Sequence, residues 1–329
     1  MGAPRQADRD ATLDLLKALS IPSPARAALD FARVYGVLAA CFLALVTRPL
    51  PAPVLAVVFL VVSAQQYALA ILTHEGQHYL LARDRRRNDR VTAWLAAAPI
   101  GSNFFVTRRI HFAHHDHLGD NAADPERRLH SVVDKVPLIR WLWHFASLLL
   151  GRKILTTYRG AAGPVADDGG ARGAALGDVV RVVLVQGLIL GALWAAGRPN
   201  LYLVFWLAPL LTTTVLLDSL RQFCEHATLD IERDAGAGYA DRLITHLCGP
   251  LEAFFMAPLH MNYHGEHHLY PFIPHHNLPR LSRLIRAGAI VPKTPIAYHG
   301  SLLATTWRFL TRIAGHYGIL RQRAGADRR

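Results

Sequence analysis

The apolar stretch PVLAVVFLVVSAQQYALAILT, residues 53–73, runs directly into the motif HEGQH, residues 74–78. A helix needs roughly 20 mostly apolar residues to cross the hydrocarbon core of a bilayer, and this uncharged stretch is long enough. The two histidines that follow are spaced i and i+4, so on a helix they lie on the same side. The sequence therefore predicts a membrane-spanning helix with a pair of imidazoles at its polar end.

Three more stretches are apolar enough to cross a bilayer or nearly so: residues 31–46, 179–196 and 201–217. Short connections that contain proline, residues 47–52 and 197–200, join the four stretches in neighbouring pairs. Proline interrupts a helix because it lacks a backbone N–H and clashes with the preceding turn. We therefore expect an all-α, multi-pass membrane protein with four transmembrane helices in two hairpins and a cytosolic helical cap.

The charge balance predicts how these helices are oriented. Apolar residues make up 52% of the chain, yet 36 Lys and Arg against 24 Asp and Glu leave a formal net charge of +12. Arginines cluster at residues 83–87, after the second stretch, and again near the C terminus. Because cytoplasmic loops are enriched in Lys and Arg, both termini and the long middle loop are expected in the cytosol. This orientation explains the basic character without a nucleic-acid partner.

The remaining bulk features indicate one domain. The first 30 residues lack the apolar core of a secretory signal, and the three cysteines form no C-x-x-C pair. No internal repeat with a fixed period is visible, so residues 1–329 are expected to form a single domain.

The 18 histidines are unevenly distributed. Besides HEGQH, two clusters share the spacing H-x-x-H-H: HFAHH at residues 111–115 and HGEHH at residues 264–268. Helical spacing of this kind presents several imidazoles on one side, which is typical of metal ligands. The eight candidate ligands are His74, His78, His111, His114, His115, His264, His267 and His268.

A ninth histidine, His226, follows the fourth apolar stretch and is expected at the same membrane face as the clusters. Gln222 lies one helical turn before it. Nine imidazoles are too many ligands for one ion, so the sequence predicts two metal ions. Neutral imidazole suits iron, zinc, copper and nickel, and it leaves the choice of metal open.

The third cluster lies in a longer pattern, NYHGEHHLYP, residues 262–271, followed by Pro274 and Pro279. This pattern resembles the N-Y-H-x-E-H-H-x-F-P element of the membrane fatty acid desaturases, with Tyr270 in place of the usual Phe. The second cluster is followed by His117, Asp120 and Asp124-Pro125, similar to the same family. The resemblance covers about residues 30–290 and leaves residues 1–29 and 291–329 as cytosolic tails.

The resemblance implies a non-heme diiron site with O₂ as cosubstrate. It assigns one iron to five histidines and the other to four, with Gln222 placed to hold a water molecule near the second. The first set is His74, His78, His111, His115 and His267, and the second is His114, His226, His264 and His268. Acids that could orient these rings through their other nitrogen are Glu75, Glu225, Glu266, Asp120 and Asp124.

The activity implied is desaturation of a lipid-linked or thioester-linked acyl chain that reaches the metals from within the membrane. No heme-binding domain is evident at either end of the sequence, so electrons are expected from a separate ferredoxin or cytochrome. The basic cytosolic face is the expected dock for that donor.

Two alternatives remain at this level. The same diiron architecture serves hydroxylases and ketolases of lipids and carotenoids, and the histidines alone do not distinguish these outcomes. HEGQH also matches H-E-x-x-H, in which two histidines bind zinc and Glu75 is the general base of a metalloprotease. That hypothesis leaves the other two clusters and His226 without a role.

Overall fold

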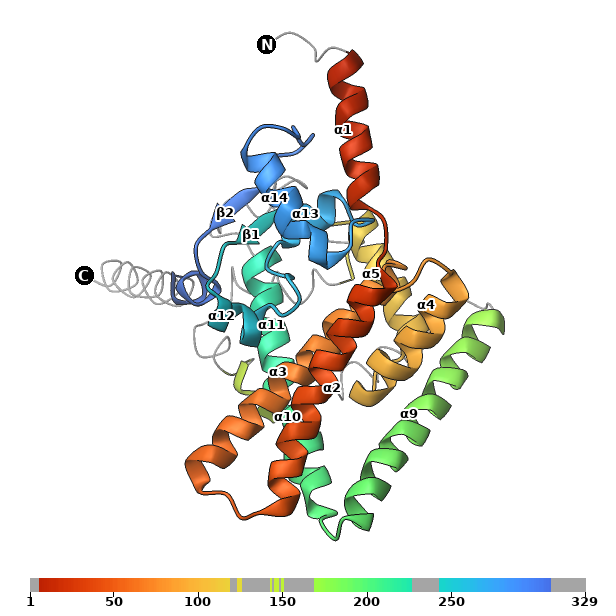
Figure 1. Ribbon diagram of the computed structural model, residues 1–329, viewed down its shortest axis with the longest axis vertical. Coiled ribbons are helices and arrows are strands. Elements are labelled where there is room, and N and C mark those ends of the chain that lie inside the picture. The colour runs from red at the N-terminus through yellow and green to blue at the C-terminus, as the bar shows by residue number, and fades with distance from the viewer. Residues whose placement is uncertain are drawn as a thin grey trace, which may run out of the picture.

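The structure, a computed structural model, describes residues 6–118, 123–125, 143, 145–147, 149–150, 169–226 and 243–308. Figure 1 shows the long helices together in the lower part of the molecule, with the shorter helices and two strands above them. The helix α1 (Gln6–Leu19) projects from the upper end.

The first hairpin consists of α2 (Pro24–Thr47) and α3 (Ala52–Gln77). The helix α2 begins earlier than predicted, because Pro24 occupies the first turn and the Ser23 hydroxyl accepts a hydrogen bond from the Arg26 N–H (3.4 Å). Ser at the N-cap followed by Pro is a strong helix start that the apolar pattern alone did not include. Apolar side chains such as Leu38 and Leu69 are buried where the two helices pack.

The second hairpin consists of α9 (Gly169–Ala195) and a fourth segment that is longer and less regular than predicted. This segment is a π-helix, η4 (Tyr202–Leu207), followed by α10 (Ala208–Leu211) and α11 (Thr213–His226). Pro209 supplies no N–H for a regular helix, and at Thr212 the backbone leaves helical geometry (φ −124°, ψ −84°). Near this break, the Gln66 side-chain amide donates a hydrogen bond to the Trp206 carbonyl (2.8 Å) inside the apolar layer.

Among the described residues, four helical segments are long and apolar enough to cross a membrane: Pro24–Thr47, Ala52–Gln77, Leu176–Ala195 and Tyr202–Glu225. They correspond to the four predicted spans, joined by short connections near Pro51 and Pro199. The prediction of an all-α membrane protein with two helical hairpins is therefore confirmed.

Shorter helices complete the structure around one end of the spans. Four elements follow α3: α4 (Arg85–Thr92), η1 (Ala93–Ala97), η2 (Ala98–Ile100) and α5 (Phe104–Asp116). The described residues after α11 include α12 (Pro250–Met256), α13 (His264–Leu269), η7 (His275–Asn277) and α14 (Leu278–Arg286), and residues 302–308 are also helical. The helices α5 and α13 carry the second and third histidine clusters next to the polar end of α3.

A two-stranded parallel sheet lies beside α13 and was not expected from the sequence. Its strands are β1 (Ile244–His246) and β2 (Ala297–His299), paired in the register Ile244 to Ala297. The predicted C-terminal tail thus contributes a strand, and Leu302 beyond it is fully buried. Strands of three residues carry little periodic signal, which is why pattern alone did not reveal them.

Candidate metal centre

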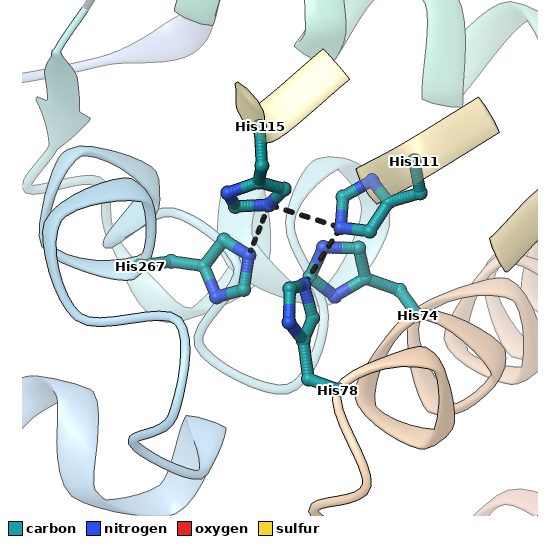
Figure 2. Close-up of side chains that lie close together, drawn as sticks. All are labelled: His74, His78, His111, His115 and His267. Atoms are coloured by element: carbon teal, nitrogen blue, oxygen red, sulfur yellow. Dashed lines mark hydrogen bonds between the residues drawn. The ribbon is translucent and has the colours of Figure 1, made fainter. Parts of the chain in front are cut away.

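Five histidines from three distant parts of the chain converge on one point. One ring nitrogen from each of His74, His78, His111, His115 and His267 lies within 4.8 Å of all the others. Figure 2 shows their rings facing one another from α3, α5 and α13. These are the five histidines that the family resemblance assigned to one ion, and their convergence is the central observation at this site.

Local helix geometry explains how each segment contributes to the site. His74 is in the last turn of α3 and His78 is its C-cap, so the i and i+4 spacing brings their ring centroids to 5.1 Å. His111 and His115 have the same spacing on α5, and their Nε2 atoms are 3.0 Å apart. The His111 Nε2 also lies 2.7 Å from the Nε2 of His78. The third segment completes the group, because the Nε2 atoms of His267 and His115 lie 3.2 Å apart.

The chemistry of this group fits a metal ion. Both ring nitrogens of His74 are buried and have no hydrogen-bond partner among the described residues. An unsatisfied buried polar atom costs about 1–3 kcal/mol, and a cation that accepts the nitrogen lone pair offsets that cost. Burial lowers the pKa of His78 to about 3 and that of His115 to about 2. These rings are therefore neutral at pH 7 and have lone pairs available as ligands.

A second group lies directly beside the first. The Nε2 atoms of His264 and His268 are 2.9 Å apart, and the rings of His114 and His268 are 5.1 Å apart. The His268 ring is only 4.3 Å from that of His115, so the two groups adjoin. His226 ends α11, but its side chain is outside the described part of the structure. Three of the four histidines assigned to a second ion are thus brought together, and the fourth stays a prediction.

Two of the predicted orienting acids contact this second group. The Asp124 carboxylate lies 2.9 Å from the Nδ1 of His114, and both side chains are buried. A carboxylate on Nδ1 fixes the tautomer whose Nε2 carries the lone pair that a metal ion binds. The Glu225 Oε2 lies 3.6 Å from the His264 Nε2 and also pairs with Arg221, one turn before it on α11. The Asp124 contact is of the kind that the orienting role requires, whereas Glu225 lies near the same Nε2 of His264 that faces His268.

The other predicted residues have different surroundings. The Glu75 Oε2 accepts a hydrogen bond from the backbone N–H of His275 (3.0 Å). Glu266 accepts from the hydroxyls of Tyr298 (2.9 Å) and Thr245, which hold α13 against the strand pair. The Gln222 amide donates to Asp218 (3.1 Å). Asp120 lies outside the described residues, so its predicted role stays untested.

The structure also reveals a buried polar link that the sequence did not indicate. The His275 Nε2 lies 3.0 Å from Asp30 on α2, while the His275 backbone N–H donates to Glu75 beside the first cluster. Burial lowers the pKa of His275, but the hydrogen bond with Asp30 and the charge of Glu75 outweigh it, so the pKa is raised. The sequence signal was an acid, Asp30, directly before the first predicted apolar stretch, where an unpaired charge is costly.

A family model described as fatty acid desaturase matches residues 49–301, a range that includes all three histidine clusters. The chain is also 28% identical over 264 residues to a curated protein of Bradyrhizobium elkanii named dihydrorhizobitoxine desaturase. That match covers 77% of this chain and 73% of the relative. Because the family match spans most of the sequence and the segments that converge at the metal centre, this chain belongs to the fatty acid desaturase family.

Proposed function

We propose that this protein is an O₂-dependent diiron desaturase that introduces a double bond into an acyl chain carried on a lipid or a thioester. The observation that carries the proposal is the convergence of five buried or half-buried histidines at the polar end of a candidate membrane span. Membership of the desaturase family and a relative named as a desaturase support the reaction type.

Nine histidines would hold the two iron ions. The first iron would take His74, His78, His111, His115 and His267, and the second would take His114, His226, His264 and His268. When bound, the iron pair would supply the redox chemistry by which O₂ oxidises an unactivated C–H bond. Burial keeps the His78 and His115 rings neutral, and the contact between Asp124 and the His114 Nδ1 would hold that ring in one orientation.

The location of the group explains why an apolar substrate would suit it. His74 is in the last turn of α3, whose preceding turns are apolar and lie in the membrane. An acyl chain that entered between the spans would meet the metal centre where the apolar layer ends. A water-soluble substrate gains nothing from this placement.

The electron balance requires a partner. Removing two hydrogens from the acyl chain while O₂ is reduced to two water molecules consumes two external electrons and two protons. A separate acidic ferredoxin or cytochrome would supply the electrons. The helix α14 follows the third cluster and exposes Arg280, Arg283 and Arg286 at helical spacing on one face. We place the donor at this face because opposite charge accelerates and orients docking.

The geometry argues against the zinc metalloprotease alternative. That mechanism needs Glu75 as a general base beside a metal held by His74 and His78. Instead, Glu75 Oε2 accepts a hydrogen bond from the His275 backbone N–H. His74 and His78 also share their site with histidines of the other two clusters, which the protease mechanism does not use.

Metal analysis of the detergent-purified chain, together with lipid profiling of cells that express it, tests the proposal. We expect two irons per chain and new acyl double bonds that require O₂ and reductant. One zinc and no iron after expression with iron supplied would refute the metal assignment. Oxygen-dependent hydroxylated lipid without an alkene would keep the metal centre and move the enzyme to the hydroxylases. Desaturation only of a non-acyl compound would refute the substrate class.

We also propose that the metal centre and both termini face the cytoplasm, because arginines cluster at that end of the spans. In a chain whose native cysteines are replaced, Pro51→Cys and Pro199→Cys should react with an impermeant thiol reagent added to intact cells. Arg86→Cys should react only after the membrane is permeabilised. Labelling of Arg86→Cys in intact cells would reverse the proposed orientation.

A further inference from the structure

The end of α3, between the two histidines of the first cluster, is held by an unusual set of contacts. The Gly76 carbonyl accepts hydrogen bonds from the Asn88 side-chain amide (2.8 Å), the Arg108 guanidinium (3.0 Å) and the Tyr79 backbone N–H (3.2 Å). Carbonyls at a helix C terminus lack partners within the helix and carry partial negative charge, so a cation is favourable there. Arg108 supplies that cation from α5, the helix of the second cluster.

The Arg108 side chain is buried and its contacts are specific. One Nη donates to Gly76 and to Asp89 Oδ1 (2.5 Å), and the other donates to Asp89 Oδ2 (3.2 Å) and to the Tyr79 hydroxyl (3.1 Å). Its guanidinium lies 4.3 Å from the ring centroids of both Tyr79 and Phe104. A planar guanidinium can pair with both Asp89 oxygens and also stack on aromatic rings, whereas a lysine ammonium cannot.

The turn that Arg108 supports sets the position of His78. Directly after His78, Tyr79 adopts a left-handed backbone conformation (φ 62°) at a position where glycine is usual. This conformation costs a non-glycine residue about 1–2 kcal/mol. The Tyr79 side chain offsets the strain because both its ring and its hydroxyl contact Arg108. A glycine would relieve the strain but would lose these contacts.

We infer that Arg108 is a positioning residue that locks the first histidine cluster onto the second, so that His78 and His111 meet in metal-binding geometry. Arg108 is one turn before His111 on α5, and it donates a hydrogen bond to the Gly76 carbonyl, between His74 and His78 in sequence. A single side chain thus connects both clusters without being a ligand. The inference rests on the proposed metal centre and explains how two of its three segments are held in register.

Metal titration of the full-length chain in detergent tests this role without relying on turnover. The variant Arg108→Lys keeps the charge and removes the planar guanidinium, and Arg109→Lys makes the same change at the adjacent, exposed position. Co²⁺ is the probe, because its visible absorption reports both affinity and coordination geometry. Loss of residues that orient metal ligands typically weakens affinity about 10–100-fold. We expect a loss of that size for Arg108→Lys, a smaller loss for Asp89→Asn and none for Arg109→Lys.

Folding is monitored separately by the apparent melting temperature of the metal-free proteins. A role in general stability alone would lower the melting temperature of Arg108→Lys while leaving its Co²⁺ affinity and spectrum unchanged, and that result would overturn the inference. Equal Co²⁺ binding by Arg108→Lys and Arg109→Lys would overturn it too. A wild-type chain that binds no Co²⁺ or Fe²⁺ would instead refute the metal centre, and the positioning role with it. An Arg108→Lys chain too unstable to purify would count against a positioning role, unless Asp89→Asn folds and shows the weakened binding.

Discussion

The close approach of α3 and α4 at Gly76 makes a sharp prediction for Gly76→Ala. A Cβ at this position would lie 2.7 Å from the Cβ of Thr92 and closer still to its Oγ1 and Cγ2. Carbon atoms pack at about 3.5–4.0 Å, so α4 would have to move by roughly 1 Å. Overpacking of this kind typically costs about 1–3 kcal/mol. The displaced helix carries Asn88 and Asp89, which bind the Gly76 carbonyl and Arg108.

We therefore expect Gly76→Ala to lower both the apparent melting temperature in detergent and the iron content per chain. Gly36→Ala is the matched control, because a Cβ there meets nothing within 4 Å and alanine favours a helix. A double-mutant cycle with Thr92→Gly isolates the clash, since the added Cβ should cost much less in that background. Wild-type iron content and melting temperature in Gly76→Ala would refute the packing argument.

Three further predictions follow from other contacts. The His275 pKa is raised above 6.5, so its pairing with Asp30 stabilises the fold fully below pH 6.5, and the melting temperature should fall as pH rises through the raised pKa. Asp30→Asn should abolish most of this pH dependence. Arg280→Glu combined with Arg283→Glu should raise the KM for an acidic electron donor several-fold at low salt, roughly as expected for removed docking charges. Asp124→Asn should weaken binding of one metal ion about tenfold, the lower end for lost ligand-orienting contacts.

Each of these has a distinct control. A melting temperature of Asp30→Asn that still falls with rising pH as in the wild type would assign the dependence to another group. If the rise in KM of the α14 variant were the same at high salt, electrostatic docking would be excluded. The iron content of this variant should equal that of the wild type. If Asp124→Asn bound both metal ions with wild-type affinity, its contact with His114 would not orient a ligand.

Much of the fold could be predicted because its signals are local. The length and polarity of residues 53–73 define a span, and Pro51 and Pro199 mark the turns between spans. The predicted helix bounds and strands were wrong or missing where the local pattern is weak. The start of α2 depended on the Ser23 cap, and the fourth span contains a π-helix and a break at Thr212 that an apolar pattern does not show. The strands β1 and β2 are stabilised by contacts between distant segments.

Helical spacing alone indicated which histidines share a side of each segment, because residues i and i+4 lie on the same face of any α-helix. It could not determine that five rings from α3, α5 and α13 meet within 4.8 Å, which required the packing of three segments far apart in sequence. Nor could it show that Glu75 accepts a hydrogen bond from the His275 backbone N–H, or that Arg108 donates one to the Gly76 carbonyl. The residue types and periodicity of this sequence thus determined the spans and the candidate ligands, whereas the tertiary structure decided which side chains contact them. The physical reason is that a local pattern specifies one face of one helix, while a buried polar contact depends on which two faces finally meet.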